Sequence, residues 1–238
     1  MHARLSAAAP YRPATVAGID GCRGAWVVVR VAAPGDPGTV ERVVDLAGVL
    51  LDLASSRLAA VGIDVPIGLP AAGRRRCDVE ARAMIGARRG SVFPAPVRDV
   101  LGSADYEEAV RRSRAITGVG ISRQVFGILP KIHEVDGVVT PELQRRLVEV
   151  HPEVSFTCLA GAPMTCHKAH PRGRVERLAA LRRAFPDIDD HAVPSGTRPD
   201  DVLDAFVAAW SARRWVAGTH VRLGGALDDR GLRMEIVA

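Results

Sequence analysis

Four aspartates stand at positions where carboxylates commonly bind metal ions. Asp20 ends the apolar run "VAGID" and Asp64 ends "AAVGID", while Asp201 and Asp204 open an apolar helical stretch. A spacing of three residues places two side chains one helical turn apart. Gathered carboxylates repel one another unless a cation lies among them, and oxygen ligands suit a hard divalent ion. We therefore predict that Asp20, Asp64, Asp201 and Asp204 bind Mg²⁺ or Mn²⁺.

Each aspartate also has a simpler structural explanation. Asp20 with Gly21 is a common pair in hairpin turns, and Asp64 stands before Val-Pro at a strand end. Asp201 can cap a helix and complement its dipole. Asp204 is harder to explain in this way, because it lies inside a helix with little polar surface and a buried carboxylate needs a partner.

The elements that must position these residues alternate in a way typical of an α/β fold. Apolar and β-branched runs predict strands over 15–19 and 25–31, with "DGCRG" as the hairpin turn, and a third strand from Thr39. A helix from Asp45 to about Ser56 precedes a fourth strand that reaches Asp64. A meander followed by a helical crossover predicts a mixed sheet flanked by helices. If the first and fourth strands are neighbours, Asp20 and Asp64 meet at the strand ends, where ligand-binding groups gather.

The remaining chain is predicted to be largely helical. We expect an Arg-rich helix over 75–85, and a helix from Ser122 with a kink at Pro130. Strand character returns in "RRLVEVHPEVSF", before a basic helix over 173–185 and the buried last helix "RPDDVLDAFVAAWSARRWV". We therefore expect four parts: a flexible tail (1–15), a main domain (16–217), its helical insertion (about 70–145) and a C-terminal extension (218–238).

Composition and charge narrow the class of protein. Apolar residues make up 47% of the chain, charged residues 25%, and the formal net charge is +5. Residues 71–98 hold seven arginines against Asp78 and Glu80. The planar guanidinium group suits phosphate, so this segment favours a polyanionic partner, although a solvated helix face explains it as well.

Two further features bear on location and metal content. The apolar stretches are too short for a signal peptide or a membrane span, and the cysteines form no CxxC pair, so we expect a cytoplasmic protein that contacts no membrane. The segment "CLAGAPMTCHKAH" contains Cys158, Cys166, His167 and His170, but their spacing fits no standard zinc module.

Seven motifs together resemble a bacterial and archaeal domain-of-unknown-function family that is described as predicted ribonuclease H-fold nucleases. They are "GIDGCRGAW", "GIDVPIGLP", "RRRCDVEAR", "SVFPAP", "GISRQVFGILPKIHEVD", "EVHPEVSF" and "DDVLDAF", between about Val16 and Trp215. The order of strands and acids is similar to that of the ribonuclease H-like superfamily, which includes the Holliday-junction resolvases. This resemblance implies a ribonuclease H-like mixed sheet with Asp20, Asp64, Asp201 and Asp204 in its acidic cluster.

The resemblance also implies a metal-dependent nuclease that hydrolyses phosphodiester bonds with two ions about 4 Å apart. Resolvases commonly have glutamate where this chain has the shorter Asp64. The motif "EVHPEVSF" adds His151 as a candidate proton carrier and Glu153 as a further ligand or orienting group, while a polar strand end with a turn at Pro152 explains both residues as well. Phosphates of a bound nucleic acid would then meet six arginines of the insertion, which are Arg74, Arg75, Arg76, Arg82, Arg88 and Arg89. Gln124 and Lys131 are candidates for the same nucleic-acid-binding cleft, although a place on the helix surface explains them as well.

Two other functions remain as alternatives. A catalytically silent module that binds nucleic acid or nucleotide predicts salt-dependent binding without metal-dependent cleavage. An actin-like phosphotransferase has a related core but needs two such lobes around its nucleotide. A chain of 238 residues with one core has no room for the second lobe, so this alternative ranks lower.

Overall fold

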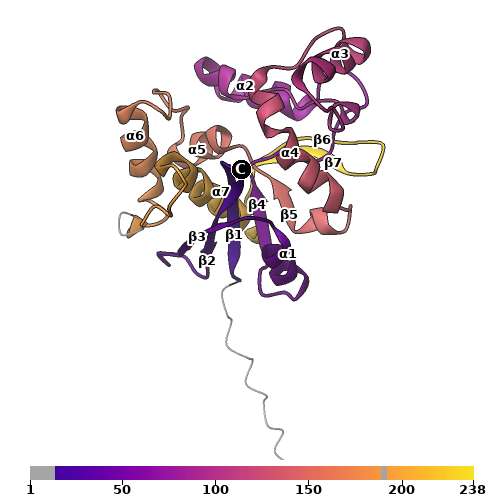
Figure 1. Ribbon diagram of the computed structural model, residues 1–238. Coiled ribbons are helices and arrows are strands. Elements are labelled where there is room, and N and C mark those ends of the chain that lie inside the picture. Colours follow the sequence, from indigo (N-terminus) through magenta and orange to yellow (C-terminus); the bar gives the residue numbers. More distant parts are fainter. Residues whose placement is uncertain (1–13, 189–191) are drawn as a thin grey trace, which may run out of the picture.

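The protein is described here from a computed structural model that covers residues 14–188 and 192–238 (Figure 1). Most of the tail expected at 1–15 therefore lies outside the described residues. Five strands form one sheet in the order β3-β2-β1-β4-β5. They are β1 (Val16–Cys22), β2 (Ala25–Val31), β3 (Thr39–Val43), β4 (Ala60–Ile63) and β5 (Leu147–Glu149).

The sheet is mixed, as the sequence predicts. The pairs β1–β2 and β2–β3 are antiparallel, whereas β1–β4 and β4–β5 are parallel. Helix α1 (Ala47–Ala54) makes the crossover between β3 and β4. The carboxylate of Asp45 accepts a hydrogen bond from the N–H of Ala47 at 2.9 Å, which stabilises the start of this helix.

Helices cover both faces of the sheet (Figure 1). One face packs on α1 and α4 (Arg123–Val138), through strand residues such as Ala17 and Ile19. The other face packs on α7 (Pro199–Ala217), next to α5 (Pro152–Ala160) and α6 (Pro171–Leu181). Because side chains alternate along a strand, the even-numbered positions of β1 and β4 face α7.

Two glycines allow α7 to lie unusually close to the sheet. A Cβ atom on Gly18 of β1 would lie 2.0 Å from the carbonyl oxygen of Ala205, and one on Gly62 of β4 would lie 2.5 Å from that of Ala208. No side chain fits at either position unless the helix moves. The alanines of α7 therefore rest on the backbone of both strands, and the buried helix that its all-round apolar pattern predicts is confirmed.

The insertion contains three helices and three short 3-10 turns. The helices are α2 (Arg76–Met84), α3 (Tyr106–Thr117) and α4, and the turns are η1 (Gly86–Ser91), η2 (Arg98–Val100) and η3 (Leu143–Arg145). The hydroxyl of Ser122 accepts a hydrogen bond from the N–H of Val125 at 3.2 Å, so α4 begins where the sequence predicts. Trp26 joins this helix to the β1–β2 hairpin, because its indole N–H donates to the carboxylate of Glu134 at 3.1 Å.

The segment expected to be a C-terminal extension forms a hairpin of β6 (Arg222–Leu227) and β7 (Arg233–Val237). Val237 forms a bridge with Val150, directly after β5. In the hairpin loop, the carboxylate of Asp228 accepts a hydrogen bond from the N–H of Leu69 at 3.1 Å and binds Arg98 at 2.5 Å. The hairpin thus holds the loop after β4 against the insertion.

Two local expectations are corrected. Asp20 is not at the bend of the first hairpin: β1 continues to Cys22, and the turn is formed by Arg23 and Gly24, which has a φ of 64°. The chain also makes neither a strand nor a simple turn at Pro152. Helix α5 begins there, because proline at the first helical position lacks only an N–H that has no helical partner.

Candidate functional site

Three aspartates from separate elements meet at the ends of β1 and β4. The register pairs Ile19 with Ile63, and the N–H of Asp64 donates to the carbonyl oxygen of Ile19 at 3.0 Å. Asp20 and Asp64 therefore follow neighbouring paired residues and face α7, where Asp204 lies one turn before Ala208. Both side chains line one cavity, and the charge of Asp64 acts on Asp20. The predicted meeting of the two strand-end acids is thus seen in the structure.

Burial and mutual repulsion make these carboxyl groups hard to ionise. Burial raises the pKa of Asp20 well above its usual value, and the charges of Asp64 and Asp204 raise it further. Burial also raises the pKa of Asp64, although the charges of His151 and Lys168 oppose this effect. For Asp204, burial raises the pKa to about 7 in spite of its contact with Lys168. The cluster therefore favours a bound positive charge.

Lys168 supplies one positive charge to the cluster. Its ammonium group donates to Oδ2 of Asp204 at 2.5 Å. Burial alone would lower the pKa of Lys168, but the charges of Asp204 and Asp20 outweigh it and raise the pKa. Lys168 is not among the site residues that the sequence motifs predict. Its signal was weak, because a single lysine in the loop before α6 resembles any solvated surface residue.

Asp201 has a different environment from the other three acids. Its Oδ2 accepts a hydrogen bond from the N–H of Arg198 at 2.9 Å, which caps the start of α7. The side chain is half-buried and lines the same cavity as Asp20 and Asp204. Asp201 therefore has the capping role that its position suggested, and its other carboxylate oxygen takes no part in this cap.

His151 and Glu153 lie beside the cluster, at the start of α5. A ring nitrogen of His151, Nε2, is 3.3 Å from the carbonyl oxygen of Ser91, and its Nδ1 has no hydrogen bond within the described residues. Oε1 of Glu153 accepts a hydrogen bond from Arg177 and lies 3.6 Å from the guanidinium of Arg88, whereas Oε2 is buried without such a partner. Both residues thus keep one unpaired polar atom.

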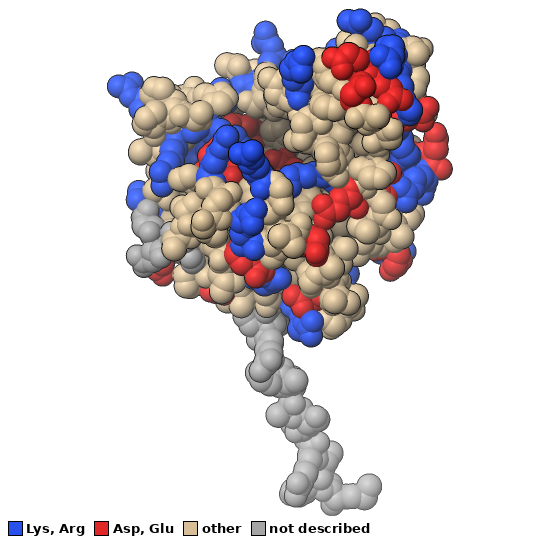
Figure 2. Space-filling model, viewed as in Figure 1, with Lys and Arg blue, Asp and Glu red and all other residues tan. Residues whose placement is uncertain are grey.

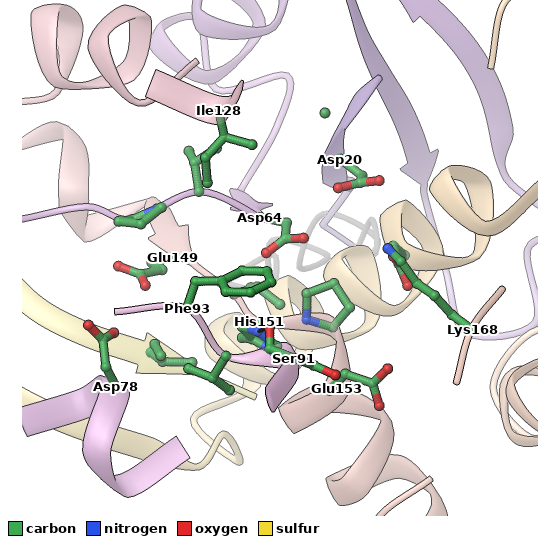
Figure 3. Close-up of a pocket in the computed structure, with 18 of the residues that line it drawn as sticks. Asp20, Asp64, Asp78, Ser91, Phe93, Ile128, Glu149, His151, Glu153 and Lys168 are labelled. Atoms are coloured by element: carbon green, nitrogen blue, oxygen red, sulfur yellow. Dashed lines mark hydrogen bonds and ion pairs between the residues drawn. The ribbon is translucent and has the colours of Figure 1, made fainter. Parts of the chain in front are cut away.

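A cavity of about 520 Å³ brings these groups together (Figure 3). One part of its wall is acidic and contains Asp20, Asp64, Asp201 and Asp204. Another part is apolar and contains Val92 and Phe93, which follow the 3-10 turn η1. In Figure 3 the labelled side chains of Asp20, Asp64 and Phe93 point toward the same space. Further lining residues are Val65, Ile128, Lys131, His151, Glu153, Lys168 and Ile236.

The donor groups in the cavity suit a hard cation, but they do not form a finished metal centre. Within residues 14–188 and 192–238, no three His, Cys, Asp or Glu side chains are arranged as a set of metal ligands. This also holds for the stretch with Cys158 and Cys166, which are free thiols. The oxygen-only chemistry of the aspartates and their raised pKa values agree with Mg²⁺ or Mn²⁺, provided that the side chains draw together around the ion.

Arg75 was predicted to bind phosphate, and the structure corrects this prediction. Its side chain is buried and donates to the carboxylates of Asp78 at 2.6 Å and Glu149 at 2.7 Å. Another nitrogen donates to the carbonyl oxygens of Ile67 and Gly68. Arg75 therefore ties α2 to β5 and to the loop after β4. No guanidinium surface remains for a nucleic acid.

The other predicted contact residues have several environments. Arg82 donates to the carbonyl oxygens of Arg89 and Val92, so it supports the loop that follows α2. Arg88 and Lys131 line the cavity. Lys131 also donates to the carbonyl oxygen of Ala25 at 2.5 Å. The remaining residues are exposed and do not line the cavity, namely Arg74, Arg76, Arg89 and Gln124.

The space-filling view shows how charge is distributed at this face. Acidic atoms lie inside a hollow, and basic side chains lie around it (Figure 2). A polyanion that enters the hollow would meet the basic side chains at its rim before it reaches the acids inside.

None of the helices in the described part of the chain is long and apolar enough to cross a membrane.

The strand order β3-β2-β1-β4-β5, with aspartates on β1, directly after β4 and on α7, defines an α/β protein with a mixed sheet flanked by helices, as the ribonuclease H-like resemblance predicts. The model of one protein family, "Protein of unknown function (DUF429)", matches residues 18–228. The chain therefore belongs to this DUF429 family. No curated protein matches it.

A comparison with solved structures finds matches of low similarity, two of which are described here. The first is Thermus thermophilus RuvC in complex with a Holliday junction substrate, with 16% identity and a TM-score of 0.36 over 87% of this chain and 97% of that one. The second is Thermus thermophilus RuvC itself, with 17% identity and a TM-score of 0.35 over 86% and 97%.

Proposed function

We propose that the protein is a metal-dependent nuclease that hydrolyses phosphodiester bonds in nucleic acid. The observation that carries this proposal is the convergence of Asp20, Asp64 and Asp204 in one cavity with raised pKa values. Buried carboxylates of this kind need a cation, and Mg²⁺ or Mn²⁺ with carboxylate and phosphate ligands meets that need. Bound divalent ions activate water for attack on phosphorus and stabilise the leaving oxygen.

The side chains fall into two groups, which are metal ligands and residues that transfer protons or bind phosphate. Asp20, Asp64 and Asp204 would hold the metal, and Asp201 would complete the set with its free oxygen or through a water molecule. Nδ1 of His151 is available to take a proton from the attacking water or to return one to the leaving oxygen. The exposed Arg74, Arg76 and Arg89 would bind phosphates that flank the scissile bond outside the cavity.

A titration calorimetry experiment tests this proposal. We expect the wild type to bind Mg²⁺ and Mn²⁺, with a stoichiometry that reports whether two ions act together, and to cleave one or more of a panel of labelled DNA and RNA substrates. Asp20→Asn should lose both properties. Asp99→Asn, an exposed aspartate outside the cavity, is the matched control and should keep both. Failure of the wild type to bind either ion would overturn the proposal.

The ion pair between Lys168 and Asp204 favours a second candidate function, which is binding without cleavage. An ammonium group inside an acidic cluster neutralises part of its charge without any metal. The protein would then bind nucleic acid or nucleotide without cleaving it. This candidate predicts binding that weakens steeply with salt and is insensitive to chelators, and the same substrate panel distinguishes it from the nuclease.

A further inference from the structure

The cavity contains an aromatic surface that the proposed hydrolysis does not use. Phe93 follows the turn η1, and 42% of its side chain is exposed although it lines the cavity. Val92, Val65, Pro66 and Ile128 extend this apolar wall. An aromatic ring that is exposed inside a cavity offers a flat face for stacking, and every nucleobase has a flat face to match it.

Two residues that line the same cavity, Glu153 and Arg88, each carry a buried polar atom without a hydrogen bond within the described residues. Oε2 of Glu153 is an acceptor without a hydrogen bond in the described part of the chain, and the residue is only 6% exposed. Nε of Arg88 is a donor that also has no partner there. The two side chains are neighbours, because Arg88 lies 3.6 Å from the other oxygen of Glu153. A buried unpaired polar atom is costly, so this arrangement points to a ligand.

The chemistry of this pair suits the edge of a nucleobase. Each of the common bases presents a hydrogen-bond donor next to an acceptor on at least one edge. A neighbouring acceptor and donor, such as Glu153 and Arg88, can bind such an edge without selecting one particular base. The cavity wall therefore offers both a stacking face and a polar edge.

The size of the cavity and the burial of the acids limit the form of the substrate. About 520 Å³ is the range that holds a small ligand, and it does not admit a double helix. Asp20 is 6% exposed and Asp204 is 1% exposed, so a phosphate must enter the cavity to reach them. Enzymes that work on a nucleotide in such a pocket take it out of the base stack.

We propose that the cavity binds one unstacked nucleotide, with its base on Phe93 and between the polar atoms of Arg88 and Glu153 and its phosphate at the acidic cluster. This inference rests on the proposed function and names its substrate class, a nucleoside phosphate that is not base-paired. The nucleotide comes either from a single strand or from a free mononucleotide.

A fluorescent base analogue tests the inference by a signal other than cleavage. The probe is 2-aminopurine, placed at the centre of a short single strand or at the same position in the matching full duplex. Adenosine monophosphate is added as a competitor. All measurements use Ca²⁺ in place of Mg²⁺. We expect the wild type and Phe93→Tyr to quench the single-stranded probe. Phe93→Ala should bind about 10-fold more weakly and should not quench. Val79→Ala, an exposed apolar residue of α2 outside the cavity, is the control and should match the wild type.

The outcomes separate the inference from the nuclease proposal. Quenching that depends on Phe93 supports the nucleotide site even if no substrate is cleaved. Competition by adenosine monophosphate at a similar concentration identifies the free nucleotide as the source, and its failure to compete identifies the strand. Equal binding of duplex and single strand without quenching, or unchanged behaviour of Phe93→Ala, would overturn the inference even if the duplex is cleaved.

Discussion

The ammonium group of Lys168 lies 2.5 Å from Oδ2 of Asp204, inside the cavity that also holds Asp20 and Asp64. A lysine and a divalent ion would therefore act on the same carboxylate. The lysine stabilises the cluster when no metal is bound, and a metal must compete with it for Asp204. The balance between the two cations can be tested directly.

Lys168→Met removes the charge and keeps an apolar chain of similar length. Because Asp204 then loses its ion pair with Lys168, we expect the metal-free protein to lose about 2 kcal/mol of stability, less than for a fully buried pair because Lys168 is partly exposed. Mg²⁺ should raise the melting temperature of this variant more than that of the wild type. Thermal denaturation with and without Mg²⁺ measures both effects. The double variant with Asp204→Asn should show non-additive losses, and additive losses would contradict the coupling.

The raised pKa of Asp204 predicts how stability depends on pH. Its value of about 7 in the folded protein lies above the ordinary value of 3.8, so the folded state binds more protons than the unfolded state between these values. The free energy of unfolding of the metal-free protein should therefore fall as pH rises from about 4 to about 7. Denaturant unfolding across this range checks the slope. Asp204→Asn should flatten it, and a slope that the substitution leaves unchanged would assign the effect to another group.

Metal binding should be linked to the same protons. Below about pH 7 the carboxyl group of Asp204 is protonated, so an ion that binds it must release a proton. We expect the affinity for Mg²⁺ to rise between pH 6 and pH 8. Calorimetry in buffers of different ionisation enthalpy measures the protons released, which should be more numerous at pH 6. Equal affinities at both values would show that Asp204 is not a ligand.

Gly18 predicts a sharp steric effect. A methyl group at this position would lie 2.0 Å from the backbone of α7, so Gly18→Ala must push the helix and Asp204 away from β1. We expect a loss of more than about 2 kcal/mol in unfolding free energy, together with weaker metal binding. Gly48→Ala is the matched control, since a methyl group there meets no atom within 4 Å. Alanine should stabilise helix α1 by up to about 1 kcal/mol.

Substitution by leucine should affect stability at Arg75 and nucleic-acid binding at the neighbouring Arg74. Arg75→Leu leaves Asp78 and Glu149 buried without their cation, so we expect a loss of about 3–5 kcal/mol in stability. Arg74→Leu, at an exposed position, should leave stability nearly unchanged and should reduce the salt dependence of nucleic-acid binding by about one phosphate contact. Chemical denaturation and binding at several salt concentrations separate the two residues.

The local patterns of this sequence predict much of the fold, because each element carries its own signal. The β-branched runs and the all-round apolar last helix are local, and so is the serine that caps α4. Asp20 and Asp64 could be placed together because two parallel strands with similar ends follow from the crossover rule.

Contacts between distant segments could not be predicted in the same way. Arg75 resembles its exposed neighbours in sequence, and only the partner Glu149, 74 residues further on, makes it a buried residue. Lys168 and Phe93 lie in loops whose positions depend on the packing of α5, α7 and the insertion. Pro152 was misread because proline both ends strands and begins helices, and only the residues that pack after it decide between the two.

The position of the β6–β7 hairpin in the chain also determines when the cavity wall is completed during protein synthesis. Ile236 lines the cavity and Val237 pairs beside Val150, yet both follow every acid of the cluster in the chain. During synthesis the aspartates of the cluster therefore leave the ribosome before β7, the strand that completes the cavity wall. We expect a growing chain to carry an incomplete cavity wall until β7 has left the ribosome, because only then can Ile236 take its place in that wall.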